Sequence, residues 1–202
     1  MVYIVIDGNI GSGKSTLIQK LIETYNYHRM PIWNIKTEDV SDWINSGWLE
    51  KYYQNDRFSF GFQMKVLLSH LKQFESLQNS NNIILERSAY TCHYVFGKML
   101  LDEEKMDELE YKLEEEYLKN FGKKPDYIIY LKTDAKVTFE RINKRSRVGE
   151  NKISFDYIQK LNDSYTTYLQ NSESKIYEIN ANLSEDEVFY ECCAILEKII
   201  KN

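Results

Sequence analysis

Short apolar runs alternate along the chain with longer stretches in which apolar residues recur at helical spacing. The apolar runs predict strands over residues 3–6, 32–36, 83–85, 127–131 and 175–179. Their uninterrupted apolar character is typical of parallel strands that are covered on both faces. Because such strands alternate with helices, the pattern indicates an α/β protein built on a parallel sheet.

Helical spacing predicts helices over residues 14–27, 57–78, 103–120, 134–145, 154–170 and 184–200. One stripe of the 57–78 helix carries the apolar side chains Phe58, Phe62, Val66, Leu67, Leu71 and Phe74. One face of the 103–120 helix carries Met106, Leu109, Leu113 and Tyr117, which makes this segment amphipathic. The chain has two prolines and no low-complexity tract or repeat that would mark a linker, so we expect a single domain over residues 1–202.

The composition excludes several classes of protein. Hydrophobic residues make up 43% of the chain and charged residues 28%, which excludes a disordered protein. No long apolar run is present, so we expect no membrane span and no membrane partner. The net charge of -5 argues against a nucleic acid partner. Nine acids and three lysines fall within residues 102–120, so we expect an acidic helix that faces solvent.

The cysteines Cys92, Cys192 and Cys193 are an odd count without the spacing of a disulfide framework, which indicates a reducing compartment. No cysteine pair has metal-ligand spacing, and the three histidines form no ligand motif with acids. The first predicted strand begins close to Met1, which leaves no room for a signal or transit peptide. We therefore expect a cytoplasmic protein.

A phosphate-binding loop follows the first predicted strand and opens the first predicted helix. Its glycines let backbone N–H groups turn toward phosphate oxygens, and the helix N-terminus adds its dipole. Lys14 bridges the terminal phosphates in such a loop, and the hydroxyl of Ser15 binds Mg²⁺. The sequence matches the whole pattern G-x-x-x-x-G-K-[ST] and predicts a nucleoside triphosphate site at Gly8, Asn9, Ile10, Gly11, Ser12, Gly13, Lys14, Ser15 and Thr16.

Other segments narrow the class of nucleotide-binding protein. A GTPase would need the pattern N-K-x-D, and the nearest segment, residues 143–146, lacks the aspartate. The third predicted strand ends in Glu86, Arg87 and Ser88. A carboxylate at that place can hold the waters of a metal ion, and an arginine can bind a phosphate or the attacking group. This arrangement favours a small-molecule kinase.

Taken together, these motifs resemble those of the deoxyribonucleoside kinase family over residues 1 to about 180. The phosphate-binding loop resembles the family P-loop, residues 86–88 its E-R-S motif and residues 141–147 its arginine-rich lid. Residues 37–40 resemble the family E-P-V turn, except that Asp39 stands where proline is usual. The resemblance implies a P-loop kinase fold with a five-stranded parallel sheet, helices on both faces and an arginine-rich lid.

Glu38 follows the second predicted strand, at the carboxyl edge of the sheet where ligands of open parallel sheets bind. A carboxylate there can accept the proton of a substrate hydroxyl while that hydroxyl attacks the γ-phosphorus. The alternative is a solvated acid in a loop. In the lid, Arg141 and Arg145 lie four apart on one helix face and Arg147 follows. The alternative for these arginines is an exposed basic helix end.

For the acceptor, the resemblance implies a nucleoside pocket. Tyr52 and Glu150 match the pair that holds the 3′-hydroxyl of the deoxyribose, although Tyr53 is a rival for the first position. Gln63 matches the amide that reads the base edge, Phe96 the aromatic that stacks on the base, and Trp43 the aromatic that flanks it. Ordinary core packing is the alternative for both aromatic residues.

Substrate choice depends on two further positions of the resemblance. Cytidine- and purine-preferring members place an arginine and an aspartate near the base, where this chain has His70 and Cys92, with Val66 nearby. Neither residue supplies that charge pair, so the pocket resembles the thymidine-accepting type. His70 could donate to a base carbonyl or lie on the helix surface without a ligand role.

The sequence therefore predicts a kinase that transfers phosphate from ATP, with Mg²⁺, to the 5′-hydroxyl of deoxynucleosides, with pyrimidines preferred and thymidine accepted. In this prediction Lys14 and the lid arginines stabilise the transferring phosphoryl group, and Ser15 and Glu86 hold the metal. Glu38 is the base and Arg87 assists it. Family members are commonly homodimers, so we expect a homodimer with the 57–78 helix as a candidate interface.

Two alternatives to this activity remain open from the sequence. A nucleoside monophosphate kinase of the thymidylate kinase type would need extra basic groups for the acceptor's phosphate, whereas Glu38 and Glu150 would repel it. A non-catalytic P-loop subunit that only binds nucleotide would have no reason to keep both Glu38 and a lid of three arginines. Assays with nucleosides and with a monophosphate separate the three possibilities.

Overall fold

The computed structural model describes residues 1–27, 33–145 and 153–201. Within these ranges five parallel strands form one sheet in the order β2-β3-β1-β4-β5. The strands are β1 Val2–Asp7, β2 Asn34–Lys36, β3 Asn82–Glu86, β4 Tyr127–Lys132 and β5 Lys175–Asn180. Ile6 pairs with Glu86, so β1 and β3 end side by side. The segments that follow these two strands therefore meet at one edge of the sheet.

Helices occupy most of the remaining chain. The longer ones are α1 Lys14–Tyr27, α4 Ser59–Glu75, α7 Glu108–Phe121, α8 Ala135–Arg145, α9 Phe155–Asn171 and α10 Glu185–Ile200. The shorter ones are α2 Val40–Asn45, α3 Trp48–Gln54, the 3₁₀-helix η1 Asp56–Phe58, α5 Ala89–Thr91, the π-helix η2 Cys92–Gly97 and α6 Lys98–Asp102. Across the described ranges, none of these helices combines the length and the apolar composition needed to cross a bilayer.

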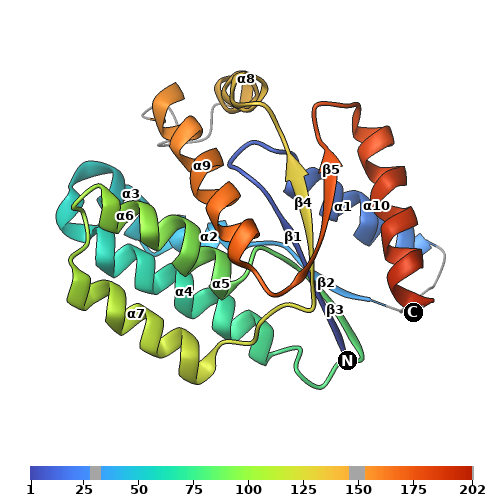
Figure 1. Cartoon of the computed structure of the whole chain (residues 1–202), viewed down its shortest axis with the longest axis horizontal. Coiled ribbons are helices and arrows are strands. Elements are labelled where there is room, and N and C mark those ends of the chain that lie inside the picture. Colours follow the sequence, from blue (N-terminus) through green and yellow to red (C-terminus); the bar gives the residue numbers. More distant parts are fainter. Residues whose placement is uncertain (28–32, 146–152, 202) are drawn as a thin grey trace.

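Both faces of the sheet are covered, as the apolar strands predict. Figure 1 shows α1 and α10 on one side of the sheet and α4, α7 and α9 on the other. Successive residues of β1 point to opposite faces. Ile4 and Ile6 belong to the core with α1 and α10, whereas Tyr3 and Val5 pack with the opposite layer. The predicted α/β class and the five-stranded parallel sheet with helices on both faces are confirmed.

Element boundaries differ from the sequence-based prediction in three places. The second strand begins at Asn34, and residue 32 lies outside the described residues. The predicted 57–78 helix is divided into η1 and α4, which ends at Glu75. The predicted 103–120 helix begins at Glu108, because the side chain of Asp107 accepts from the backbone N–H groups of Leu109 and Glu110 and caps the first turn.

The predicted apolar face of this acidic helix is wrong at three of its four residues, and the fourth, Met106, is buried but precedes α7. Leu109 is 76% exposed, and Leu113 and Tyr117 are also exposed, whereas α7 buries Glu114 and Leu118. Glu114 and Leu118 are four residues apart and therefore lie on one face of the helix. Helix α7 packs against α4 and η2. The expectation that this acidic helix faces solvent fails at Glu114, which is fully buried.

Candidate active site

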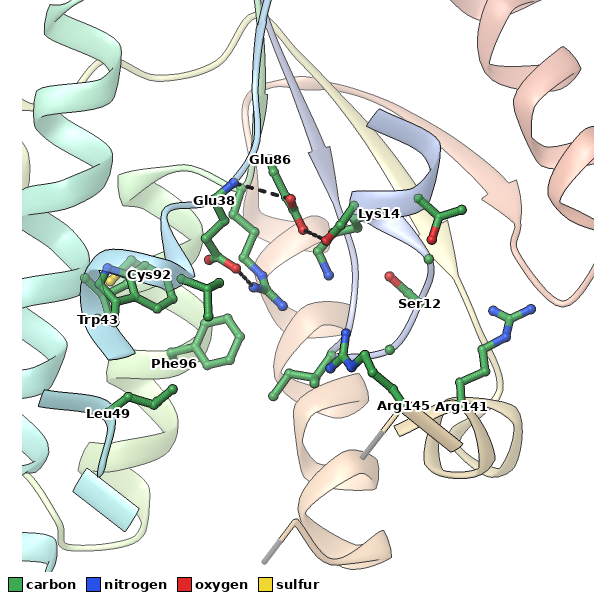
Figure 2. Close-up of a pocket in the computed structure, with 18 of the residues that line it drawn as sticks. Ser12, Lys14, Glu38, Trp43, Leu49, Glu86, Cys92, Phe96, Arg141 and Arg145 are labelled. Carbon is green, nitrogen blue, oxygen red and sulfur yellow. Dashed lines mark hydrogen bonds and ion pairs between the residues drawn. The ribbon is translucent and has the colours of Figure 1, made fainter. Parts of the chain in front are cut away.

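One continuous cavity of about 550 Å³ opens at the carboxyl edge of the sheet, where β1, β2 and β3 end. The phosphate-binding loop and α1 form one end of the cavity, and α2, α3, α4 and η2 form the other (Figure 2). The sequence-predicted residues that line it are Ile10, Gly11, Ser12, Gly13, Lys14, Ser15, Thr16, Glu38, Trp43, Tyr52, Gln63, Glu86, Arg87, Phe96, Arg141 and Arg145. Arg147 and Glu150 lie outside the described residues.

The start of the phosphate-binding loop requires glycine and is anchored to α9. Gly8 has φ +148°, and a Cβ atom there would lie 2.8 Å from the carbonyl oxygen of Leu131 and 2.8 Å from Ser12 Oγ. The amide Nδ2 of Asn9 donates to Asn162 Oδ1 at 2.7 Å and to the carbonyl of Ile158 at 3.0 Å. These contacts fix the course of the loop before any ligand is bound.

The amino group of Lys14 is buried within this loop. Its Nζ donates to the carbonyl oxygens of Gly8 at 3.0 Å and Asn9 at 2.8 Å. Burial, together with the positive charge of Arg87, lowers the pKa of Lys14 to about 7. A bound phosphate would favour the charged form of this group, so its protonation is coupled to nucleotide binding.

Ser15 and Glu86 form a hydrogen-bonded pair beside the loop. The hydroxyl of Ser15 donates to Glu86 Oε1 at 2.8 Å, and Glu86 Oε2 accepts from the backbone N–H of Glu38 at 3.3 Å. Hydroxyl and carboxylate oxygens are the donors that Mg²⁺ prefers. Where the chain is described, no group of three or more histidine, cysteine or acidic side chains could hold a metal ion by itself. The pair therefore fits a Mg²⁺ ion whose other ligands are phosphate oxygens and waters.

Glu38 and Arg87 form a buried ion pair near the middle of the cavity. The Nη1 of Arg87 donates to Glu38 Oε2 at 2.6 Å, and His70 Nε2 lies 3.5 Å from Glu38 Oε1. Burial alone would raise the pKa of Glu38, but the charge of Arg87 and the contact with His70 lower it to about 2. His70 is buried, so its placement on the helix surface is excluded.

Arg87 adopts a left-handed backbone conformation that is rare outside glycine, with φ 59°. Its guanidinium group lies 4.9 Å from the centre of the Phe96 ring, and its Nε donates to the hydroxyl of Tyr165 at 3.3 Å. Strained backbone persists only where the surroundings determine it, and here these contacts hold the guanidinium group toward Glu38. The sequence pattern gives no signal of this conformation.

Asp7 is a fully buried residue that sequence reasoning missed. Its carboxylate accepts from the hydroxyl of Tyr165 at 2.8 Å, from the backbone N–H of Gly8 at 2.8 Å and from the hydroxyl of Thr91. Tyr165 in turn contacts Arg87, so Asp7 links the phosphate-binding loop to the Glu38 pair. A single acid at the end of an apolar strand is the signal that could have found it.

Aromatic side chains form the other end of the cavity. Trp43 is buried, and its Nε1 donates to Ser69 Oγ at 3.2 Å. Tyr52 stacks on Phe62 at 4.8 Å between ring centres. Tyr53 also lines the cavity, so both candidates for the 3′-hydroxyl contact stay open. Leu49, Leu100 and Tyr157 complete this end and were not predicted.

Helix α8 places Arg141 and Arg145 beside the phosphate-binding loop (Figure 2). Arg141 is tied to the backbone, because its Nη1 donates to the carbonyl of Ala181 at 3.0 Å. Sequence reasoning missed the segment after β5, where Ala181, Leu183 and Val188 line the same end of the cavity. Their apolar side chains supply a surface on which the base of a nucleotide can rest.

Comparisons with known proteins agree with this geometry. The deoxynucleoside kinase family model matches residues 4–200. A Fowlpox virus protein named "Probable deoxycytidine kinase FPV151" is 33% identical over 191 residues, which are 89% of this chain and 78% of the viral protein. The deoxyadenosine kinase of Dictyostelium discoideum is 31% identical over 190 residues, which are 91% of this chain and 73% of that protein.

Similarity to solved structures covers the same extent. The structure of deoxyadenosine kinase from M. mycoides with products dCMP and a flexible dCDP bound has a TM-score of 0.83 to this chain at 26% identity. The similarity covers 96% of this chain and 98% of that one. Since the family model spans almost every residue and the fold agrees, this chain belongs to the deoxynucleoside kinase family and is a phosphotransferase that acts on deoxynucleosides.

Proposed function

We propose that this kinase transfers the γ-phosphoryl group of ATP to the 5′-hydroxyl of deoxynucleosides, with pyrimidines preferred and thymidine among the accepted substrates. The observation that carries the proposal is the Glu38–Arg87 ion pair of 2.6 Å. It lies between the phosphate-binding loop at one end of the cavity and the aromatic residues at the other. A hydroxyl that reaches Glu38 from the aromatic end faces the phosphates of a nucleotide in the loop.

The donor end of the cavity supports ATP as the phosphate donor. Backbone N–H groups of the phosphate-binding loop, of which residues 10–16 line the cavity, and the ammonium group of Lys14 would bind the phosphates. Arg141 and Arg145, with Arg147 of the lid, would stabilise charge on the transferring group. Ser15 and Glu86 would hold Mg²⁺, which supplies neutralisation of phosphate charge when it is bound.

The acceptor end supports activation of a hydroxyl group. Glu38 is ionised at neutral pH, so one of its carboxylate oxygens can accept the proton of the 5′-hydroxyl. The hydroxyl oxygen of the nucleoside then attacks the γ-phosphorus. Arg87 holds the carboxylate in place and neutralises its charge beside the phosphates. Phe96 and Trp43 would contact the two faces of the base, and Tyr52 with Glu150 would hold the 3′-hydroxyl.

The preference for pyrimidines rests on the pocket and on one relative. A single amide, Gln63, lines the base end, and its oxygen can accept a hydrogen bond from an N–H group at N3 or C4 of a pyrimidine. The Fowlpox virus relative is named for a pyrimidine nucleoside, whereas the Dictyostelium relative is named for a purine nucleoside. The preference among the four deoxynucleosides is therefore the quantity to measure.

The test is release of ADP from ATP and Mg²⁺ in the presence of each of the four deoxynucleosides and, separately, thymidine monophosphate. We expect turnover with all pyrimidine deoxynucleosides, lower kcat/KM with purines, and none with the monophosphate. Turnover only with thymidine monophosphate would make the protein a monophosphate kinase. Higher kcat/KM for deoxyadenosine or deoxyguanosine than for deoxycytidine would refute the pyrimidine preference.

A further inference from the structure

The acidic helix α7 places one carboxylate, that of Glu114, inside the protein behind the base end of the cavity. Glu114 is fully buried, and its Oε1 accepts from Gln63 Nε2 at 2.9 Å. Its Oε2 lies 3.3 Å from His93 Nδ1, although that oxygen has no hydrogen-bond partner among the described residues. A buried carboxylate is costly to the fold unless its contacts compensate for lost hydration, so the contact with Gln63 calls for an explanation.

Both hydrogens of the Gln63 amide are held by the protein. In addition to Glu114, Nε2 donates to the backbone carbonyl of Cys92 at 2.6 Å, and Cys92 Sγ lies 3.2 Å away. The reverse orientation would place the amide oxygen against two acceptor oxygens, the Cys92 carbonyl and the Glu114 carboxylate. The two acceptors therefore fix the amide, and Oε1 is the atom of Gln63 that is left to meet a ligand in the cavity.

The absence of a side chain at Gly97 leaves the space that the Glu114 carboxylate occupies. A Cβ atom at Gly97, the last residue of the π-helix η2, would lie 2.5 Å from Glu114 Oε2 and 3.1 Å from Gln63 Nε2. Any larger residue at position 97 would displace one of the two side chains. Gly97, Glu114 and Gln63 come from three separate elements, and they fit together only in this arrangement.

We infer that Glu114 is a positioning residue that makes Gln63 a hydrogen-bond acceptor toward the base and thereby selects bases with an exocyclic amino group. The inference deepens the proposed function and rests on it, because it assumes that the base lies at Gln63. Among pyrimidines it ranks deoxycytidine above deoxyuridine and thymidine. Among purines it ranks deoxyadenosine above deoxyinosine.

The chemistry of the base edges gives the direction of this preference. Cytosine can donate its exocyclic amino group to Gln63 Oε1, and only one atom beside that amino group, N3, carries a lone pair that faces the amide. Uracil offers N3–H, but two carbonyl oxygens flank that group and would face Oε1 and the negative charge of Glu114. With no N–H left on Gln63, nothing on this amide can pair with the carbonyl at C4.

The test compares kcat/KM for deoxycytidine and deoxyuridine, which differ only in the amino or carbonyl form of this edge. For the unaltered enzyme we expect a ratio of at least about 10 in favour of deoxycytidine. In Glu114→Gln the new amide can donate as well as accept, which lets Gln63 turn, so the ratio should fall to within about threefold of 1. Glu116→Gln, an exposed acid on the same helix, is the matched control and should keep the original ratio.

The ratio separates specificity from damage to the fold, because a merely unstable variant would lose both activities together. A ratio below 3 in the unaltered enzyme, or an unchanged ratio in Glu114→Gln, overturns the inference. If Glu114→Gln does not fold, the kcat/KM ratio of the unaltered enzyme still tests the inference. Deoxyadenosine and deoxyinosine then serve as a second pair of substrates.

Calorimetric binding of the same nucleosides keeps this inference distinct from the proposed function. Tighter binding of deoxycytidine than of deoxyuridine supports the role of Glu114 even in an enzyme that gives no turnover. Absence of turnover with every deoxynucleoside refutes the proposed function. Equal affinity for the two nucleosides refutes the inference alone.

Discussion

The chemistry of the site depends on how individual charges are placed, and Glu38 is the clearest case. A carboxylate that is buried to this degree would ordinarily hold its proton, but Arg87 at 2.6 Å keeps it ionised. The carboxylate is therefore ionised at neutral pH, as its proposed role as a proton acceptor requires. The arginine that binds Glu38 Oε2 has a strained backbone, so its contacts with the rest of the protein fix the position of that oxygen.

Replacement of this carboxylate by an amide tests its role. We expect Glu38→Gln to lower kcat by about 10²–10⁴-fold with a much smaller change in KM for ATP, because the amide cannot accept the hydroxyl proton. Asp39→Asn is the matched control, since Asp39 is exposed and asparagine caps α2 as well as aspartate does. Steady-state kinetics with deoxycytidine measure both. A Glu38→Gln enzyme with full kcat would contradict the assignment.

The low pKa of Lys14 predicts a pH dependence. The free enzyme carries the ammonium group below pH 7 and loses it above, so kcat/KM for ATP should fall as the pH rises through about 7. A Lys14→Arg enzyme should lack this falling limb, because guanidinium stays charged. The measurement is kcat/KM for ATP between pH 6 and 9 at saturating nucleoside. A flat profile for the unaltered enzyme over this range would disprove the coupling.

At the scale of elements, the pattern of apolar residues was sufficient to predict the strands of the sheet and the long helices. Strand periodicity and the P-loop placed β1 and α1 correctly, because both follow from local sequence. The site was harder to predict, because motif matches identified many of the residues that line the cavity but neither all of them nor their orientation. The hydrogen bonds of Asp7 and the strain at Arg87 arise from contacts between distant segments.

Helix α7 shows why the rest could not be predicted. Its four-residue spacing supports an apolar face at Leu109 and Leu113, yet the buried face holds Glu114 and Leu118. Which face is buried depends on what the neighbouring helices offer, and here a glycine in η2 and an amide in α4 accommodate a carboxylate. The spacing of apolar residues indicates that a helix has a buried and an exposed face, but it does not identify the element against which the helix packs.

The turn between β1 and α1 can be tested through Gly8. We expect Gly8→Ala to lower the free energy of unfolding by about 2–4 kcal/mol, since both the positive φ and the clash with Leu131 oppose a side chain. Gly47→Ala is the control, because Gly47 also has a positive φ but no atom within 4 Å of a Cβ, and should cost only about 1 kcal/mol. Urea denaturation measures both. Equal losses would show that the close approach at Gly8 contributes nothing.

At the scale of the whole molecule, two neighbouring helices carry several exposed apolar side chains. On α7 they are Leu109, Leu113, Tyr117 and Phe121, and Leu68 is exposed on the adjacent α4. Figure 1 shows both helices in the layer opposite α1 and α10. Where such side chains form a contiguous patch, that patch often marks a site of association. The homodimer that the family resemblance implies stays a prediction, with α7 joining α4 as the candidate interface.

Light scattering tests this prediction. We expect a mass of about twice the 24.1 kDa of the chain at micromolar concentration. Leu109→Glu with Leu113→Glu should convert the dimer to a monomer that keeps its fold, because both side chains are exposed within one chain. Tyr190→Glu, at a 69% exposed position on α10, should leave the mass unchanged. A monomeric unaltered protein would end the proposal.

The wall behind the proposed base site is assembled from three helices, and none of them carries a residue that we propose to bind phosphate. Gln63 belongs to α4, Gly97 to η2 and Glu114 to α7, whereas Lys14 begins α1, and Glu38 and Arg87 follow β2 and β3 at the edge of the sheet. We therefore expect substitutions at these three positions to change which nucleoside is accepted, with a smaller effect on phosphoryl transfer. For an evolving lineage this separation makes a shift of substrate a matter of few substitutions, and for an engineer it marks where a library of variants should be built.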